Sequence, residues 1–371
     1  MSKRIFKILG NQWGQRITLL LVIVIVMLIF QQRFFRISNI YSILLSIAIY
    51  GTMACGMLFV ILVGGIDLCQ GSTAAMAAVI LIKSANVFGQ TTTTFIIGAI
   101  VAIAAGALLG LFHGIECAYF KVPAFVLTLA TQYTIYGLLN VLTEGVYIQA
   151  LPRGVIYYVG SGRPLGIPMP IIIFILCSVI LAFVLSRTKF GRRIYAVGGN
   201  PEAASLVGIK SKMHIVIAYI MSGIFASLGG IMLCCMNLQA SYVTASGYHG
   251  NVLTAMVVGG VNLAGGEGSI AGAIFGALLV GIINNIMILL DIPADYQLFV
   301  QGVIIVCAVA LNMYTYRRSL GLTGVDKHIF DDPGQKQTLE GMATEGPTAG
   351  DPAAENPAAE GSAAEGSADT N

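Results

Sequence analysis

The chain has 371 residues, of which 57% are hydrophobic and only 10% are charged, and its mean hydropathy is +0.85. A soluble domain carries about 25% charged residues, so the composition excludes an ordinary soluble protein and indicates an integral membrane protein. The net charge of +3 averages two regions, because residues 320–371 hold ten of the seventeen acids. The rest of the chain carries 18 bases and 7 acids, which suits contact with anionic membrane lipid and gives no reason to expect a nucleic-acid partner.

Apolar stretches long enough to cross about 30 Å of hydrocarbon at about 1.5 Å per residue predict the membrane spans. In chain order they are 17–34, 40–62, 95–115, 123–143, 168–186, 214–236, 268–290 and 294–313. Two shorter stretches rich in Gly, Ala and Ser, 72–88 and 250–263, are each either a buried span or a partial, re-entrant helix. Counting both, we predict an all-α polytopic membrane protein of ten transmembrane or partly re-entrant helices.

The distribution of basic residues predicts which side of the membrane each segment faces. With ten crossings and the N-terminus inside, the cytoplasmic segments hold thirteen Lys and Arg against five outside, leaving aside the tail. The positive-inside rule therefore favours an N-in, C-in orientation. Residues 1–16 form a cytoplasmic N-terminus and 17–319 the transmembrane domain, and the Pro-, Ala- and Glu-rich residues 320–371 form a disordered acidic cytoplasmic tail.

A short motif occurs twice: VGGIDL at 63–68 returns as VGGVNL at 258–263. Each copy is followed within ten residues by Gly-Ser and an Ala-rich stretch. The repeat predicts two related halves, either parallel or inverted, as in many transporters; a chance match is the alternative in so Gly- and Val-rich a chain. The stretch after the second copy carries Gly268, Gly272 and Gly276 at steps of four, which predicts close helix packing.

Few polar side chains fall inside the apolar stretches, so each is a candidate for lining a translocation path. Capping of the following helix is the favoured role for Asp67 and Asn262, and interhelical hydrogen bonding for the mid-span pair Asn284 and Asn285. A stripe on one span could face an aqueous route for a polyhydroxylated solute, whereas His113 is expected to be solvated at a span end. The path candidates are Asp67, Gln132, Tyr136, Asn140, His249, Asn262, Asn284 and Asn285, with Tyr133 in the stripe.

The loop 187–213 is the most polar segment between predicted spans. It carries six bases, Arg187, Lys189, Arg192, Arg193, Lys210 and Lys212, and a short helix with small residues at Glu202, Ala203 and Ala204 before Gly208. A membrane subunit would offer such a helix to a soluble partner that drives it. The sequence has no GxxxxGK[ST] loop, HExxH, GxSxG or spaced Cys/His ligand set, and no intramembrane array of charges for a proton relay. We therefore predict a transporter without a metal or cofactor of its own, driven by another protein.

Four segments resemble the permease subunits of bacterial ABC sugar importers of the ribose/xylose/galactoside type. They are GGIDLCQGS (64–72), VPAFVLTLA (122–130), GRRIYAVGGNPEAASLVGIK (191–210) and VVGGVNLAGGEGSIAGAIFGALLVGIINN (257–285). The resemblance implies a homodimer in the bacterial plasma membrane that imports a monosaccharide, a ribose-like pentose or a hexose, by alternating access. It further implies a cytoplasmic ATPase pair that binds ATP and Mg and an outer sugar-binding protein.

The resemblance also implies that the loop contains the coupling helix, which sits in a groove of the ATPase. Its residues would be Gly198, Gly199, Asn200, Glu202, Ala203, Ala204 and Gly208. One position departs from the family pattern, because His249 stands where related permeases have an acidic residue, and this leaves the substrate open. A stand-alone secondary transporter or channel for a small polar solute is the alternative function.

Overall fold

The computed structural model describes residues 32–150 and 154–293 and positions 296, 299, 300, 302, 303, 306 and 310. All of these belong to the first of two units, residues 1–315. The predictions for the N-terminal segment 1–16, for most of the spans 17–34 and 294–313, and for the tail 320–371 lie outside the described residues.

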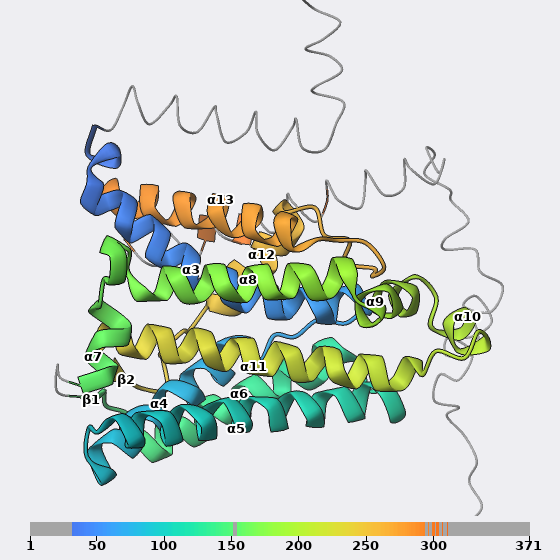
Figure 1. Ribbon diagram of the computed structural model, residues 1–371, viewed down its shortest axis with the longest axis horizontal. Helices are drawn as coiled ribbons and strands as arrows, with labels where there is room; N and C mark the ends of the chain where they lie inside the picture. Colours follow the sequence, from blue (N-terminus) through green and yellow to red (C-terminus); the bar gives the residue numbers. More distant parts are fainter. Residues whose placement is uncertain are drawn as a thin grey trace, which may run out of the picture. The chain divides into compact units, whose positions relative to one another are not determined.

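The described elements are nearly all helices (Figure 1). In chain order they are η1 (Gln32–Phe35), α3 (Ile37–Leu62), α4 (Gln70–Phe88), α5 (Thr92–Tyr119), α6 (Ala124–Thr143), β1 (Ile148–Gln149), α7 (Gly154–Ser161), η2 (Pro164–Gly166), α8 (Met169–Arg187), α9 (Lys189–Gly199), α10 (Pro201–Leu206), α11 (Ser211–Asn237), β2 (Gln239–Ala240), α12 (Tyr248–Val258) and α13 (Ile270–Leu289).

Seven of these helices are long and apolar enough to cross a membrane: α3, α4, α5, α6, α8, α11 and α13. Each falls on a predicted stretch, and α4 shows that the short stretch 72–88 belongs to a helix of 19 residues. The stretch 250–263 is different, because α12 has only 11 residues and rises about 16 Å at 1.5 Å per residue. It is a partial helix, so within the described residues the count of ten crossings is not reached.

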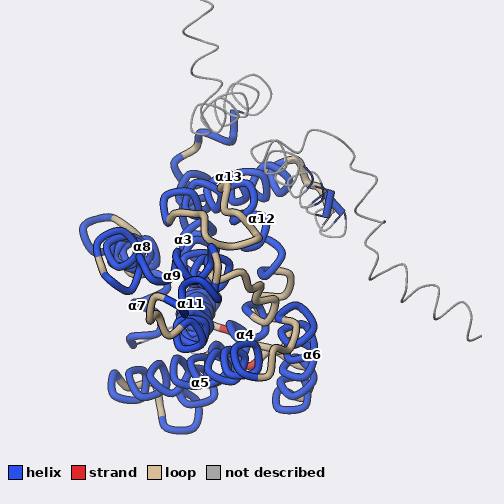
Figure 2. Tube along the Cα trace, turned by 90° about the vertical axis from the view of Figure 1, so that its right-hand side faces the viewer, coloured by secondary structure: helices blue, strands red, loops and turns tan. Residues whose placement is uncertain are grey.

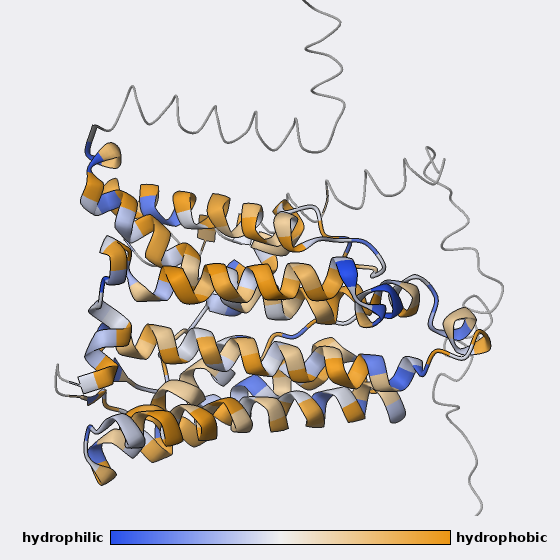
Figure 3. Cartoon of the chain, in the orientation of Figure 1, coloured by the Kyte–Doolittle hydropathy of each residue, from blue (hydrophilic) through white to orange (hydrophobic). Residues whose placement is uncertain are grey.

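The long helices run between two ends of the bundle, and the two ends differ in chemistry. The basic end carries α9, α10 and the start of α11, where hydrophilic residues gather (Figure 3). The far end carries η1, α7 and the two-stranded antiparallel sheet, in which Ile148 pairs with Ala240 (Figure 1). This sheet ties the segment after α6 to the end of α11.

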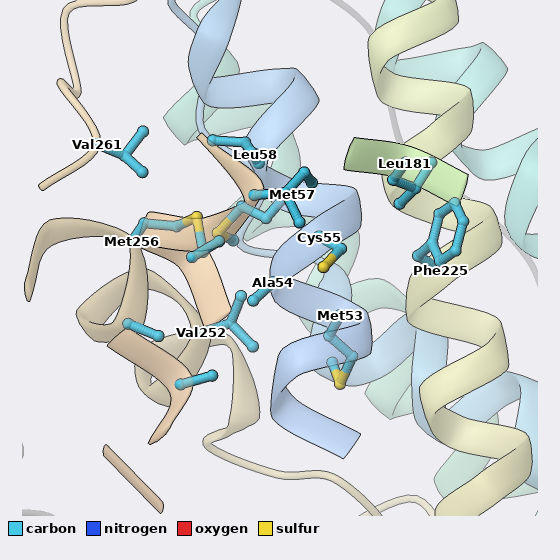
Figure 4. Packing of buried hydrophobic residues seen from close by; sticks show 14 of the residues in the cluster. Met53, Ala54, Cys55, Met57, Leu58, Leu181, Phe225, Val252, Met256 and Val261 are labelled. Carbon is cyan, nitrogen blue, oxygen red and sulfur yellow. The ribbon is translucent and has the colours of Figure 1, made fainter. Parts of the chain in front are cut away.

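Helix α3 forms the centre of the structure. In its apolar stretch 83% of the residues are buried, against 22% in α5 and in α6. Figure 2 shows α3 and α11 in the middle, with α8 on one side and α12 and α6 on the other. Side chains of α3 such as Met57 and Leu58 pack between Phe225 of α11 and Met256 of α12 (Figure 4). The outer helices keep many exposed apolar side chains, as expected of surfaces that face lipid.

Small residues let the helices cross at backbone contact. On α5, Gly106 and Gly110 face α11, where a Cβ on Gly110 would meet the carbonyl oxygen of Tyr219. On α13, Cβ atoms on Gly272 and Gly276 would meet the backbone of α12. The close packing predicted for the α13 stripe is therefore confirmed, and α5 uses the same device.

We predict that Gly110→Ala destabilises the folded protein. The added methyl group overlaps the α11 backbone, which cannot move aside as a flexible side chain can, and overpacking of this kind costs about 1–3 kcal/mol. The Tm of the purified protein in detergent should fall by several degrees. Gly137→Ala on α6 is the matched control, because its Cβ meets nothing within 4 Å; equal Tm values for the two variants would contradict the packing account.

Candidate functional site

The linker helices α9 and α10 at the basic end are held by local caps. Thr188 Oγ1 accepts a hydrogen bond from the Gly191 amide at 3.2 Å at the start of α9. Asn200 separates the two helices, and its Oδ1 accepts from the amides of Glu202 at 3.0 Å and Ala203 at 2.9 Å. These bonds satisfy orphan donors of α10, so Asn200 fixes the direction in which α10 leaves α9.

The end of α10 closes back onto its beginning. Gly208 has φ +81, and the amides of Ile209 and Gly208 donate to the carbonyls of Ala204 at 3.0 Å and Ser205 at 3.1 Å. This is a Schellman ending, for which glycine is the favoured residue. Ser211, the first residue of α11, donates to the Pro201 carbonyl at 2.9 Å. The turn from Asn200 to Ser211 is therefore a fixed unit.

The exposed face of α10 only partly matches the expected coupling surface. Glu202 and Ala203 are exposed as expected, but Ala204 is only 4% exposed and packs into the hydrophobic core. Leu206 and Val207 are 89% and 77% exposed, and the sequence analysis did not single them out. The sequence signal that could have identified them is a pair of adjacent apolar residues just before a helix-ending glycine in a charged loop.

The end of α9 lies against the backbone of two segments, 62–69 and 258–269, each of which contains one motif copy; we call them the motif loops. A Cβ on Gly198 would meet the Leu62 carbonyl oxygen and would lie 2.6 Å from the Gly266 amide nitrogen. The two loops also bind each other, because the Gly266 amide donates to the Leu62 carbonyl at 2.9 Å. Tyr195 Oη adds a bond to the Gly268 carbonyl at 2.7 Å. Because glycine has no side chain, the backbone of α9 at Gly198 contacts these loops directly.

We predict that the neighbouring glycines Gly198 and Gly199 tolerate alanine very differently. The methyl group of Gly198→Ala would overlap the backbone at Leu62 and at Gly266, whereas a Cβ on Gly199 meets nothing within 4 Å. Gly198→Ala should therefore lower the Tm and the yield of folded protein, and Gly199→Ala should leave both unchanged. A thermal melt of the two variants beside the parent protein checks this, and a stable Gly198→Ala protein would show that the contact is not tight.

The acidic residue of the first motif copy and the amide residue at the same place in the second copy make the same local hydrogen bond. Asp67 Oδ1 accepts from the Cys69 amide at 2.9 Å, and Asn262 Oδ1 accepts from the Ala264 amide at 3.0 Å. Both close a turn ahead of a helix, although the helix caps themselves are Cys69 and Ser269. Asp67 is 3% exposed, and its Oδ2 accepts from Ser222 Oγ at 2.6 Å. The prediction that Asp67 and Asn262 cap the following helices was therefore wrong: each side chain closes a turn in the loop, and the helices begin at other caps.

The predicted stripe on α6 divides between two environments. Tyr136 Oη and His249 Nδ1 approach the same spot on α4, at 3.0 and 3.4 Å from the Cβ position of Gly71. Gln132, one turn earlier, is buried, and within the described residues its Oε1 and the Nδ1 of His249 have no hydrogen-bond partner. Tyr133 and Asn140, in contrast, lie on the exposed side of α6. The structure therefore brings together Tyr136 and His249, with the buried Gln132 one helical turn from Tyr136 on α6.

The mid-span amides form interhelical pairs, as favoured from the sequence. Asn285 and Asn39 donate to each other's side-chain oxygens at 2.8 and 2.9 Å, and Asn284 donates to Asn251 Oδ1 at 3.2 Å. The expectation for His113 was wrong: its side chain is buried near the ring of Tyr219, with 6.4 Å between ring centroids. It faces α11 through the glycine-rich side of α5, which an apolar span-end pattern does not reveal.

Seven long apolar helices, an exposed basic linker helix and neutral polar groups in the interior define a polytopic membrane transport protein. The chain belongs to the permease family described as "Branched-chain amino acid transport system / permease component", which matches residues 39–309. This confirms that the chain is a multi-pass membrane permease component and not itself an enzyme.

Its relatives include permeases named for sugars. The ribose import permease of Escherichia coli strain K12 is 34% identical over 296 residues, which cover 79% of this chain and 91% of that protein. The ribose import permease of Bacillus subtilis strain 168 is 37% identical over 79% of this chain and 90% of its own length. The L-arabinose permease of Escherichia coli strain K12 is 33% identical over 82% and 92%. No solved structure matches the chain.

Proposed function

We propose that this chain is the membrane subunit of an ATP-driven, binding-protein-dependent importer of a monosaccharide. Permeases named for ribose and L-arabinose match it over most of their length, whereas the family description names branched-chain amino acids. The active unit is a homodimer in the bacterial plasma membrane with an ATPase pair at the basic end and a sugar-binding protein at the far end.

The observation that carries this proposal is the contact of α9 with both motif loops. Partner-driven movement of the fixed unit 200–211 would reach α9 through Asn200. From Gly198 it would act directly on the backbone at Leu62 and Gly266, ahead of α4 and α13. Alternating access requires helices to move relative to one another, and a rigid linker that contacts the loops before two helices can transmit such a movement.

The same contact supports two related halves in parallel orientation. The motif follows α3 in the first copy and α12 in the second, and each copy leads into a helix that runs toward the far end, α4 and α13 (Figure 1). Because these helices run toward the same end, both copies have the same direction. Six bases between 187 and 213 at this end favour its placement in the cytoplasm, and hence the N-in, C-in orientation.

The proposal is tested by transport in proteoliposomes. The chain is reconstituted with the ATPase and binding protein encoded by neighbouring reading frames, and uptake of D-ribose, L-arabinose and L-leucine is compared. We expect sugar uptake that needs ATP and the binding protein, and no leucine uptake. Sugar uptake that persists without ATP under clamped ion gradients would favour the stand-alone transporter, and leucine uptake would favour the amino acid class.

We predict that the double variant Leu206→Ser, Val207→Ser uncouples the complex. Both side chains are exposed in this chain, so their loss should not reduce folding, but buried apolar anchors at an interface each contribute on the order of 1–2 kcal/mol. ATP-dependent uptake should fall about tenfold or more. Equal Tm values for the double variant and the parent protein in detergent are the control for folding. Full activity of the double variant would show that α10 does not form the ATPase contact.

A further inference from the structure

A polar groove opens at the far end of the bundle, between α3 and α13. Its volume is about 340 Å³, and it is lined by Asn39, Ser42, Ser46, Tyr50, Asn284, Asn285 and Ile288. Six of these seven side chains can form hydrogen bonds and none is charged. We propose that this groove is the outer solute-binding site of the permease and that it takes a neutral polyhydroxylated molecule. This inference rests on the proposed import function and names the site that receives the solute.

The α3 wall is a single polar stripe. Asn39, Ser42, Ser46 and Tyr50 are three or four residues apart, so they share one face of the helix. Ser42 and Ser46 donate to the carbonyls of Ser38 and Ser42, each at 3.1 Å, which leaves hydroxyl oxygens as acceptors. Exposure falls from Ser42, which is exposed, to Tyr50, which is buried. The stripe therefore leads from the far end into the protein.

The α13 wall is held in place by the amide pair. Asn39 and Asn285 bond each other in both directions, and Asn39 also donates to the Phe34 carbonyl at 2.9 Å. Each amide group has two donors and an oxygen with two lone pairs, so Asn285 keeps a donor and Asn39 an acceptor lone pair for a solute. A wall fixed by hydrogen bonds does not need to be ordered when the solute binds, which favours affinity.

Tyr50 and Tyr248 close the inner end of the groove. Their ring centroids are 4.7 Å apart at an interplanar angle of 56°. The next residue on α12, His249, points toward Gly71 and Tyr136, so the tyrosine pair separates the groove from the inner polar cluster of Gln132, Tyr136 and His249. The short helix α12 links this pair to the second motif loop, against which α9 rests. Contacts therefore run without interruption from α9 through the second motif loop and α12 to the tyrosine pair.

The lining selects for a neutral polyol over an amino acid. A hydroxyl group donates and accepts, as do the amide and hydroxyl groups of the groove. An ammonium or carboxylate group that leaves water is best compensated by an opposite charge, and the seven lining residues provide none, so the groove favours a neutral solute. The buried carboxylate of Asp67 is already bonded to Cys69 and Ser222.

The proposal is tested by placing a larger side chain in the groove and measuring transport by the reconstituted complex. Ser46→Leu should lower D-ribose uptake about tenfold or more while ATP hydrolysis stimulated by the binding protein persists, so that sugar moved per ATP falls. Ser186→Leu is the matched control, because Ser186 on α8 makes the same bond to a carbonyl four residues back, at 2.6 Å, and is exposed. Normal uptake by Ser46→Leu would overturn the proposal. An absence of sugar uptake by the parent complex would instead refute the proposed function.

A second measurement keeps the proposal testable if Ser46→Leu fails to fold. Ser42→Cys is labelled with a membrane-impermeant maleimide, and labelling of the parent chain is subtracted. Excess D-ribose should slow the labelling at least threefold, and L-leucine should not. Labelling that is insensitive to both solutes would overturn the site, and protection by leucine would overturn its preference for polyols.

Discussion

The structure depends on one constraint: backbone amides and carbonyls inside an apolar environment must be bonded within the protein. Helices meet it by themselves, whereas the loops 63–69 and 259–269 must find other partners. The second loop does so through the last residue of α3, from the Gly266 amide to the Leu62 carbonyl, and both loops use a side chain, Asp67 in the first and Asn262 in the second. Irregular backbone is thus concentrated where the two motif copies meet. The same place receives the end of α9, and helix movement there is possible without breaking a long helix.

The partial helix α12 connects the two functional ends of the proposed mechanism. Its first residue packs against the Tyr50 ring at the inner end of the groove, and its last leads into the loop beneath α9. Gly276 of α13 packs directly against its backbone, so that α12 and α13 are in close contact. A full-length span at this position would have been anchored at both membrane surfaces. An 11-residue helix can instead respond to the linker helices.

Hydropathy predicted the long helices because span length and apolar character follow directly from the thickness of the bilayer. It could not show that 250–263 holds only a partial helix, since buried partial and buried full helices have the same composition. The stripe at Asn39, Ser42, Ser46 and Tyr50 was visible as a helical period, but which helix completes the groove is a tertiary fact. The burial of Ala204 and His113 could not be predicted for the same reason. Small and aromatic neighbours in sequence do not identify the helix that will cover them.

The seven residues that line the groove include no acidic or basic side chain, which fits a permease that depends on an external drive. A carrier coupled to protons or ions needs ionisable groups that change charge along the path. In the described part of the chain the groove and the cluster of Gln132, Tyr136 and His249 hold amides, hydroxyls, phenols and one imidazole, while the Asp67 carboxylate is bound in a turn. Hydrogen bonds of this kind bind a polyol equally well whichever side is open. In the proposed mechanism, direction then comes from which side the helices expose, and the loops beneath α9 set that choice.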